Sequence, residues 1–200
     1  MNALEFALIA QESYTAAPDI GVAASASRAI VRLTDAGLVV AFPGSDNGEC
    51  WEADFDIDII DVPGIGKVHR GFWNAWVTLS DAVVAAIADR PVIFVGHSLG
   101  AAIAVCAAAA LTVEGKPPIA VYGFEPPRVS PETNIAAILA TVPVALYRNG
   151  LDIVPDVPFY WQLSAPLIQI GKPELPFPNT LDHSIVKVID ALTTSQEATT

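Results

Sequence analysis

The chain is poor in cysteine and in cationic side chains, and each shortage excludes a class of protein. Its 200 residues include only 2 cysteines, Cys50 and Cys106, which offer neither a disulfide framework nor a metal-binding spacing. Lysine and arginine number 10 against 22 acidic residues, which gives a formal net charge of −12. Because nucleic-acid binding needs cations that neutralise phosphates, we expect no nucleic-acid partner and no adhesion to anionic lipid.

Long apolar runs and a secretory leader are also lacking. The longest apolar stretch, 91–113, is interrupted by a glycine-bearing turn at 96–100, so neither part approaches the roughly twenty residues that span a bilayer. Residues 1–14 carry Glu5 and Glu12, whereas a signal peptide has a basic start and a small-residue cleavage site. We therefore expect a cytoplasmic protein without integral membrane association, although export after removal of a leader would leave a similar sequence.

What the chain does contain is typical of one globular domain. Apolar residues make up 52% and charged residues 16%, and we find no repeat or low-complexity linker. We predict a single domain over 1–200, with a flexible tail at 193–200. Strands that alternate with helices indicate a mostly parallel central sheet covered by helices on both faces. The predicted strands are 29–33, 38–42, 91–95, 119–124 and 142–147, and the predicted helices are 4–14, 71–88, 101–110, 131–140 and 184–192.

The most informative motif is Gly96-His97-Ser98-Leu99-Gly100, which lies between a predicted strand and an alanine-rich predicted helix. A strand, a tight turn that favours glycine and a helix together form a nucleophile elbow, which raises the serine hydroxyl at the carboxyl end of a sheet. Small side chains in the following helix would let it lie close to that sheet. The motif therefore predicts a hydrolase with Ser98 as its nucleophile.

A serine nucleophile needs a general base, and the chain offers 3 histidines. His97 adjoins the serine in the elbow, where neighbouring side chains diverge. His69 precedes the serine, whereas the base of an open α/β hydrolase comes last in the chain. His183 has that late position, at the start of the last predicted helix. We predict His183 as the base and His69 as a structural or pocket-wall residue.

The acid that orients the base must lie after Ser98 and before the base. Asp152 follows the predicted strand 142–147 and has the required position. Asp156 lies four residues further on, and Asp182 would have to fold back to reach the ring of its sequence neighbour. We predict Asp152 as the acid, with Asp156 and Asp182 as alternatives.

An oxyanion hole needs two donors directed at the developing negative oxygen. The first predicted donor is the backbone amide of Leu99, which follows the nucleophile. The second is the amide of Ser45, helped by its hydroxyl, in the segment Phe42-Pro43-Gly44-Ser45 that ends a predicted strand. The alternative for this segment is an ordinary turn.

The acidic segment 54–59 alternates aspartate with apolar residues. An EF-hand calcium loop would need glycine at its sixth position and glutamate at its twelfth, where this chain has Ile59 and Ile65. A strand with one wet and one buried face explains the alternation better. We predict no metal site and no organic cofactor.

Together, several segments in one order resemble the lipase class 3 family, the fungal-type triacylglycerol lipases of the α/β-hydrolase fold. The resemblance implies that fold, lipid ester substrates, the triad Ser98, Asp152 and His183, and the oxyanion donors Ser45 and Leu99. The matching segments are Phe42-Pro43-Gly44-Ser45, Trp51 with Asp54, Val68-His69-Arg70-Gly71-Phe72, residues 96–102, residues 124–129, Arg148 with Asp152-Ile153-Val154-Pro155, and Asp182-His183.

The chain also departs from the family pattern. Pro43 stands where the family usually has arginine, and Glu125 and Pro126 replace small residues. The segment 46–55, which corresponds to the family's lid, has few apolar residues. We therefore expect weak or absent interfacial activation and a preference for short to medium acyl esters. The apolar loop 154–175 either walls the acyl site or belongs to the core.

Two alternatives for the function stay open. The same triad could act on phospholipid, feruloyl or polyester substrates. A catalytically idle α/β hydrolase that serves as a binding module is the other, and the complete triad argues against it. Oligomeric state is not written in the sequence.

Overall fold

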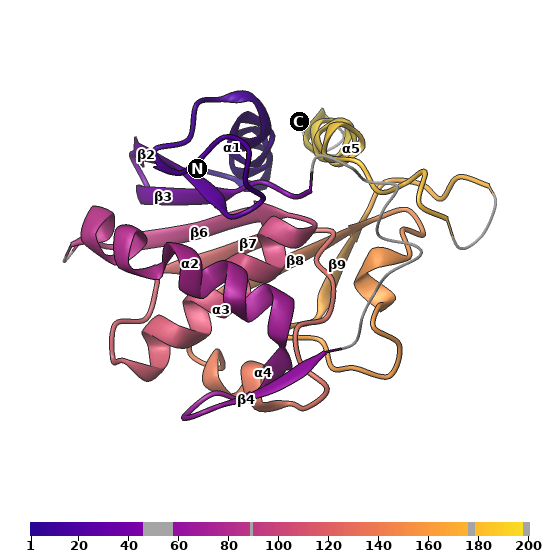
Figure 1. Cartoon of the computed structure of the whole chain (residues 1–200). Helices are drawn as coiled ribbons and strands as arrows, with labels where there is room; N and C mark the ends of the chain where they lie inside the picture. Colours follow the sequence, from indigo (N-terminus) through magenta and orange to yellow (C-terminus); the bar gives the residue numbers. More distant parts are fainter. Residues whose placement is uncertain (46–57, 89, 176–178, 198–200) are drawn as a thin grey trace.

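A central sheet organises the computed structural model, which describes residues 1–45, 58–88, 90–175 and 179–197 (Figure 1). From β3 to β9 the neighbouring strands pair in parallel, whereas β1 and β2 form an antiparallel edge. This arrangement confirms the predicted α/β fold. In spatial order the strands are β1 (Ile20–Gly21), β2 (Arg28–Thr34), β3 (Gly37–Phe42), β6 (Val92–His97), β7 (Ala120–Phe124), β8 (Val144–Asn149) and β9 (Leu167–Ile170).

Helices cover both faces of the sheet. On one face lie α2 (Arg70–Ile87), α3 (Leu99–Val113) and α4 (Asn134–Ile138), and on the other lie α1 (Ala3–Thr15) and α5 (Ile185–Glu197) (Figure 1). The strands supply both layers by alternation. In β3, Val40 and Phe42 join the α2–α3 layer, whereas Val39 and Ala41 join the α1–α5 layer.

Helix α3 is the most deeply buried helix of the described chain. Every residue from Gly100 to Leu111 is buried, and most are alanine. Cys106 lies among them, and burial raises the pKa of its thiol to about 12, as expected of an unreactive apolar residue. Small side chains allow α3 to lie directly against β6 and β7, which positions the turn at its start.

Several elements differ from the sequence prediction. A hairpin of β4 (Ile59–Val62) and β5 (Gly66–His69) and the edge strand β9 are additional, and α4 is shorter than the predicted helix 131–140. Helix α5 continues to Glu197, beyond the predicted helix 184–192 and into the segment predicted as a tail, 193–200. Cys50, the lid segment 46–55 and most of the acidic alternation 54–59 lie outside the described residues.

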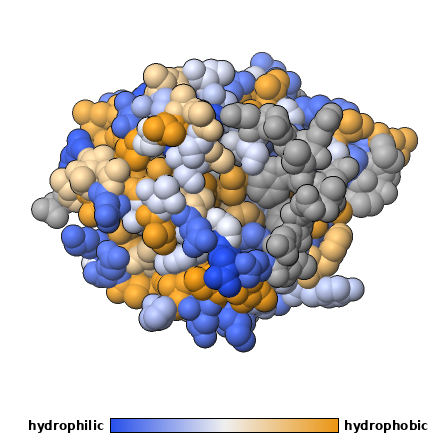
Figure 2. Space-filling model, in the orientation of Figure 1, coloured by the Kyte–Doolittle hydropathy of each residue, from blue (hydrophilic) through white to orange (hydrophobic). Residues whose placement is uncertain are grey.

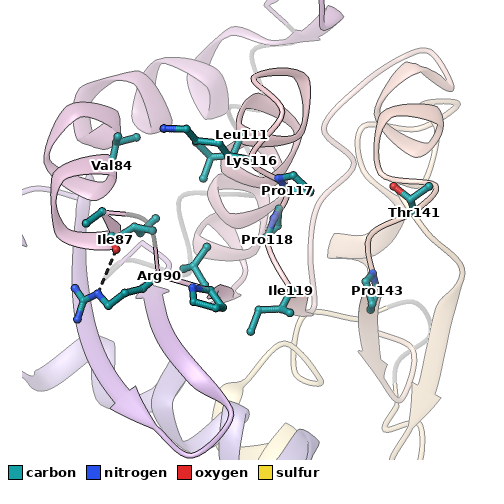
Figure 3. A pocket seen from close by; sticks show the side chains of 13 residues that line it. Val84, Ile87, Arg90, Leu111, Lys116, Pro117, Pro118, Ile119, Thr141 and Pro143 are labelled. Atoms are coloured by element: carbon teal, nitrogen blue, oxygen red, sulfur yellow. Dashed lines mark hydrogen bonds between the residues drawn. The ribbon is translucent and has the colours of Figure 1, made fainter.

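No helix among the described residues is long and apolar enough to cross a membrane. Polar and apolar residues are interspersed over the face of the molecule that Figure 2 shows. An apolar pocket of about 600 Å³ opens near the start of β6 and β7, at the end of these strands opposite the elbow (Figure 3). Val84, Leu111 and Ile119 line it, with Arg90 and Lys116 among its few polar residues.

Candidate active site

The turn between β6 and α3 holds Ser98 in a strained backbone conformation with positive φ, at φ 56° and ψ −125°. Glycine is required on both sides of it. A Cβ on Gly100 would lie 2.0 Å from the carbonyl oxygen of Phe42, and one on Gly96 would lie 2.2 Å from the Gly100 carbonyl. The Ser98 amide donates to the Phe124 carbonyl at 2.9 Å, so the serine is fixed between two strand ends. This is the geometry that the motif predicts.

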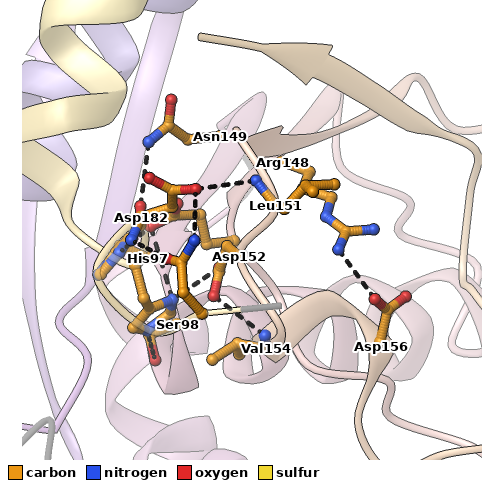
Figure 4. Close-up of polar contacts among 12 residues, drawn as sticks. His97, Ser98, Arg148, Asn149, Leu151, Asp152, Val154, Asp156 and Asp182 are labelled. Carbon is orange, nitrogen blue, oxygen red and sulfur yellow. Dashed lines mark hydrogen bonds and ion pairs between the residues drawn. The ribbon is translucent and has the colours of Figure 1, made fainter. Parts of the chain in front are cut away.

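A continuous hydrogen-bonded relay connects Ser98 to a buried carboxylate through His183. The Ser98 Oγ lies 2.9 Å from His183 Nε2, and His183 Nδ1 lies 2.8 Å from Asp152 Oδ2. Asp152 is fully buried, and its other oxygen accepts from the Val154 amide at 3.0 Å (Figure 4). The structure thus brings together the three residues predicted as a triad.

The two alternative acids have other partners. Asp156 forms ion pairs with Arg148 at 2.9 Å and Arg128 at 3.2 Å. Arg128 also donates to the carbonyls of Pro155 and Trp161, so this cluster stabilises the loop that follows the predicted acid. Neither contact involves the relay.

Asp182 stabilises the turn before α5. Its Oδ2 accepts from the amides of Leu151 at 2.9 Å and Glu174 at 3.2 Å, and from the Asn179 side chain. Burial disfavours the Asp182 carboxylate, but these donors outweigh burial and lower its pKa. Asp182 therefore ties the His183 turn to the loop that carries Asp152.

The two alternative bases are also accounted for. His69 caps α2, where its Nδ1 accepts from the Gly71 amide at 3.1 Å and its ring stacks on Phe72. The ring of His97 stacks beside that of His183, and its nitrogens contact other groups: Nδ1 lies 2.5 Å from the Tyr14 hydroxyl and Nε2 lies 2.9 Å from Glu125 Oε2. Neither is placed to accept the Ser98 proton.

The predicted oxyanion donors flank the nucleophile. Leu99 is the first residue of α3, where the backbone dipoles favour negative charge. A Cβ on Gly44 would lie 3.1 Å from the Ser98 Cβ, which shows how closely the segment before Ser45 approaches the serine. The roles of Leu99 and Ser45 stay predictions.

A second buried carboxyl group lies beside the catalytic histidine. Glu125 follows β7, has 0% exposure and adopts a left-handed φ of 54°. Its Oε2 lies 2.9 Å from His97 Nε2 and 3.6 Å from His183 Nδ1. The sequence signalled Glu125 only as a replacement of a small family residue, and its proximity to His183 was missed.

Electrostatics favour the neutral forms of this pair. Burial, followed by the charge of Asp152, raises the pKa of Glu125 well above its ordinary value, although the backbone amides of Ser184 and Asn149 act in the opposite direction. Burial, followed by the influence of His183, lowers the pKa of His97. In the neutral pair the Glu125 carboxyl donates to His97 Nε2, and His97 Nδ1 donates to the Tyr14 hydroxyl.

Among the described residues, one trio is spaced for a metal ion. His97, Glu125 and His183 each offer one atom within 4.8 Å of the others. His183 Nε2 contacts Ser98 and His183 Nδ1 contacts Asp152, so these two hydrogen bonds explain the position of the ring and no cation is needed to explain it.

The apolar loop 154–175 contains both kinds of residue that its composition suggested. Trp161 is 8% exposed and belongs to the core, whereas Phe159 and Tyr160 are 58% and 94% exposed. The exposed pair follows the loop of the predicted acid, so it is available to contact a ligand.

Comparison with known proteins places this geometry in context. The family model for "Lipase (class 3)" matches residues 39–161. Secreted mono- and diacylglycerol lipase A of Penicillium cyclopium is 32% identical over 171 residues, which cover 78% of this chain and 54% of that protein. Secreted mono- and diacylglycerol lipase 1 of Fusarium solani is 36% identical over 135 residues, which cover 60% and 39%. The chain thus spans about half the length of the curated relatives it matches.

Solved structures share the fold. One described as a triacylglycerol lipase whose catalytic centre is a serine protease triad has a TM-score of 0.72 and 21% identity, covering 90% of this chain and 91% of that one. A mutant of MDLA from Penicillium cyclopium has a TM-score of 0.68 and 24% identity, covering 91% and 82%. At these identities the likeness supports the α/β-hydrolase fold.

The expectation of a cytoplasmic protein is wrong, because the curated relatives are named secreted lipases. That expectation relied on acidic residues near the start of the chain. In the structure, Glu5 lies in the first turn of α1 and forms a capping box with Asn2, so its charge reflects helix capping.

Proposed function

Since the chain belongs to the class 3 lipase family, we propose that it is a serine hydrolase that cleaves carboxylic esters of lipids. The observation that carries this proposal is the unbroken relay from Ser98 through His183 to the buried Asp152. A nucleophile, a base and an orienting acid within hydrogen-bond distance are what ester hydrolysis through an acyl-enzyme requires.

In the proposed mechanism, Ser98 attacks the ester carbonyl as His183 Nε2 accepts its proton. Asp152 holds the ring through Nδ1 and stabilises the imidazolium. The amides of Leu99 and Ser45 stabilise the tetrahedral oxyanion. His183 then protonates the departing alcohol, and a water molecule, activated by the same histidine, releases the acid from Ser98.

We propose mono- and diacylglycerols with short to medium acyl chains as substrates. The names of the fungal relatives support the glyceride class, since both are called mono- and diacylglycerol lipases. The exposed Phe159 and Tyr160 provide apolar contacts beside the loop of Asp152. The acyl preference depends on the poorly amphipathic segment 46–55.

A Ser98→Ala variant tests the proposal. Its rate of hydrolysis of p-nitrophenyl esters of increasing acyl length should fall by about 10⁴-fold or more, because the oxyanion hole alone leaves little catalysis. Labelling by a fluorophosphonate probe should also disappear. Ser80→Ala, on the outer helix α2, is the matched control and should keep both. Substantial turnover by the Ser98 variant, or an unlabelled wild-type protein, would contradict a serine hydrolase and favour an idle binding module.

A further inference from the structure

Glu125 lies at the point where three segments of the active site meet. Its Oε2 lies 2.9 Å from His97 Nε2 and 3.6 Å from His183 Nδ1, on the side of the ring that faces Asp152. The imidazole rings of His97 and His183 stack with centroids 4.9 Å apart. A second carboxyl group is thus within reach of the nitrogen that the acid of the relay orients.

The backbone at Glu125 indicates that this placement is maintained by its surroundings. Residues other than glycine rarely adopt a backbone φ of 54°, and those that do are enriched at functional sites. The Glu125 amide donates to the Tyr147 carbonyl at 2.7 Å, which fixes the turn after β7 against β8. The strained turn therefore directs a fully buried carboxyl group at the histidine pair.

A hydrogen-bonded chain orients Glu125 from the other side. The Tyr14 hydroxyl lies 2.5 Å from His97 Nδ1, and His97 Nε2 contacts Glu125. Tyr14 belongs to the last turn of α1, so this chain links the α1–α5 face of the sheet to the relay. The charged or titratable groups that face Glu125 are His97, His183, Asp152 and Asp182.

We propose that Glu125 is a second acid of the relay, a positioning residue that supports His183 beside Asp152 and takes over its orientation when the Asp152 carboxylate is absent. The inference deepens the proposed hydrolase activity and rests on it. With Asp152 charged, Glu125 retains its proton and bonds to His97. Removal of the Asp152 charge takes away the second cause of the raised Glu125 pKa, after burial, so Glu125 ionises more readily. A small shift of the His183 ring then closes the 3.6 Å gap and lets its Nδ1 donate to Glu125 Oε2.

A double-mutant cycle measures this coupling. The variants are Asp152→Asn, Glu125→Gln and the double variant, and the readout is the rate of Ser98 labelling by a fluorophosphonate. This readout does not depend on the identity of the natural substrate. We expect Glu125→Gln to slow labelling at least about tenfold more in the Asp152→Asn background than in the wild type. Equal factors in the two backgrounds would overturn the role of Glu125.

The matched control is Glu132→Gln, which removes a half-exposed carboxylate bound to Lys67 at 2.8 Å. It should slow labelling in neither background, and an effect equal to that of Glu125→Gln would overturn the proposal. The dependence of the labelling rate on pH distinguishes a residue that positions His183 from one that only stabilises the fold. Labelling of Asp152→Asn should fall more steeply toward acid than that of the double variant, because only the former needs an ionised Glu125.

Tyr14→Phe keeps the proposal testable if Glu125→Gln does not fold. Loss of the hydroxyl removes the support of His97, so it should slow labelling more in the Asp152→Asn background than in the wild type. Equal effects there would overturn the chain from Tyr14 to Glu125. Absence of Ser98-dependent labelling in the wild type would overturn the hydrolase activity as well, which distinguishes the two failures.

Discussion

At the scale of single residues, two neighbouring strands are each followed by a non-glycine residue whose backbone has a positive φ. Ser98 follows β6 and Glu125 follows β7, with φ values of 56° and 54°. The strands are in register there, since His97 pairs with Phe124. Conformations of this kind cost about 1–3 kcal/mol each, and the surrounding contacts must compensate for them. Two of the four non-glycine residues with positive φ in the described chain therefore lie where the proposed chemistry occurs.

Glu125 also makes the stability of the fold depend on pH. Its pKa in the folded protein is raised, chiefly by burial and then by Asp152, above the ordinary value of 4.5. Between these two pKa values the unfolded chain is ionised while the folded protein keeps its proton. The free energy of unfolding should therefore fall as pH rises through this window, by about 1.4 kcal/mol for each pH unit.

The Glu125→Gln variant should lack this loss, because an amide does not titrate. Urea unfolding of the variant and the wild type between pH 4 and pH 8 measures the difference. Glu132→Gln, at an exposed ion pair, should retain the downward slope of the wild type. Parallel curves for the wild type and Glu125→Gln would show that Glu125 is ionised in the folded protein.

At single residues, the sequence is most informative where chain order limits the chemistry. Ser98 lies in a motif with an obligatory turn, and His183 is the histidine that follows it, so their meeting was predictable. The neighbours Asp156 and Asp182 could be separated from Asp152 only by their arginine and amide partners, which the fold assembles. Glu125 lies close to His183 because three loops converge in the fold, and no local sequence pattern predicts this convergence.

At the scale of elements, strongly patterned segments were predictable and hydrophilic or irregular ones were not. The predicted strands at 38–42 and 119–124 match β3 and β7 closely. Strand β9 was missed because it follows a proline-rich loop and is only four residues long. Helix α5 extends beyond its apolar stripe, where Thr193, Thr194 and Ser195 donate their hydroxyls to carbonyls four residues earlier, so its end carries no apolar pattern that the sequence could show.

Helix α3 should tolerate no increase in volume along its buried face. Ala107 is 0% exposed, so Ala107→Leu should destabilise the protein by about 1–3 kcal/mol through overpacking. Because α3 begins at Leu99, a shift of the helix should also slow fluorophosphonate labelling of Ser98. Urea unfolding and the labelling rate measure these effects.

The control lies at the end of the same helix. Val113 is 47% exposed, and Val113→Leu should change the free energy of unfolding by less than about 0.5 kcal/mol. If the two leucine variants unfold at the same urea concentration, the close approach of α3 to the sheet does not limit its side chains.

At the scale of the whole molecule, the net charge of −12 should weaken adsorption of the proposed hydrolase to an anionic lipid surface. Hydrolysis of tributyrin droplets should be slower when the droplets contain an anionic phospholipid than when they contain a zwitterionic one. About 0.15 M salt should reduce the difference, since the Debye length is then about 8 Å. Hydrolysis of a water-soluble ester should be insensitive to salt. Equal rates on both kinds of droplet would show that charge does not control adsorption.

The packing of α1 against α5 has a further consequence for truncated forms of the chain. The two helices pack together on one face of the sheet although they lie far apart in the sequence (Figure 1). His183 lies directly before α5, so a chain that stops before residue 183 carries Ser98 without the base proposed for it and also lacks the helix that packs on α1. Such a truncated chain should therefore show no Ser98-dependent labelling by a fluorophosphonate.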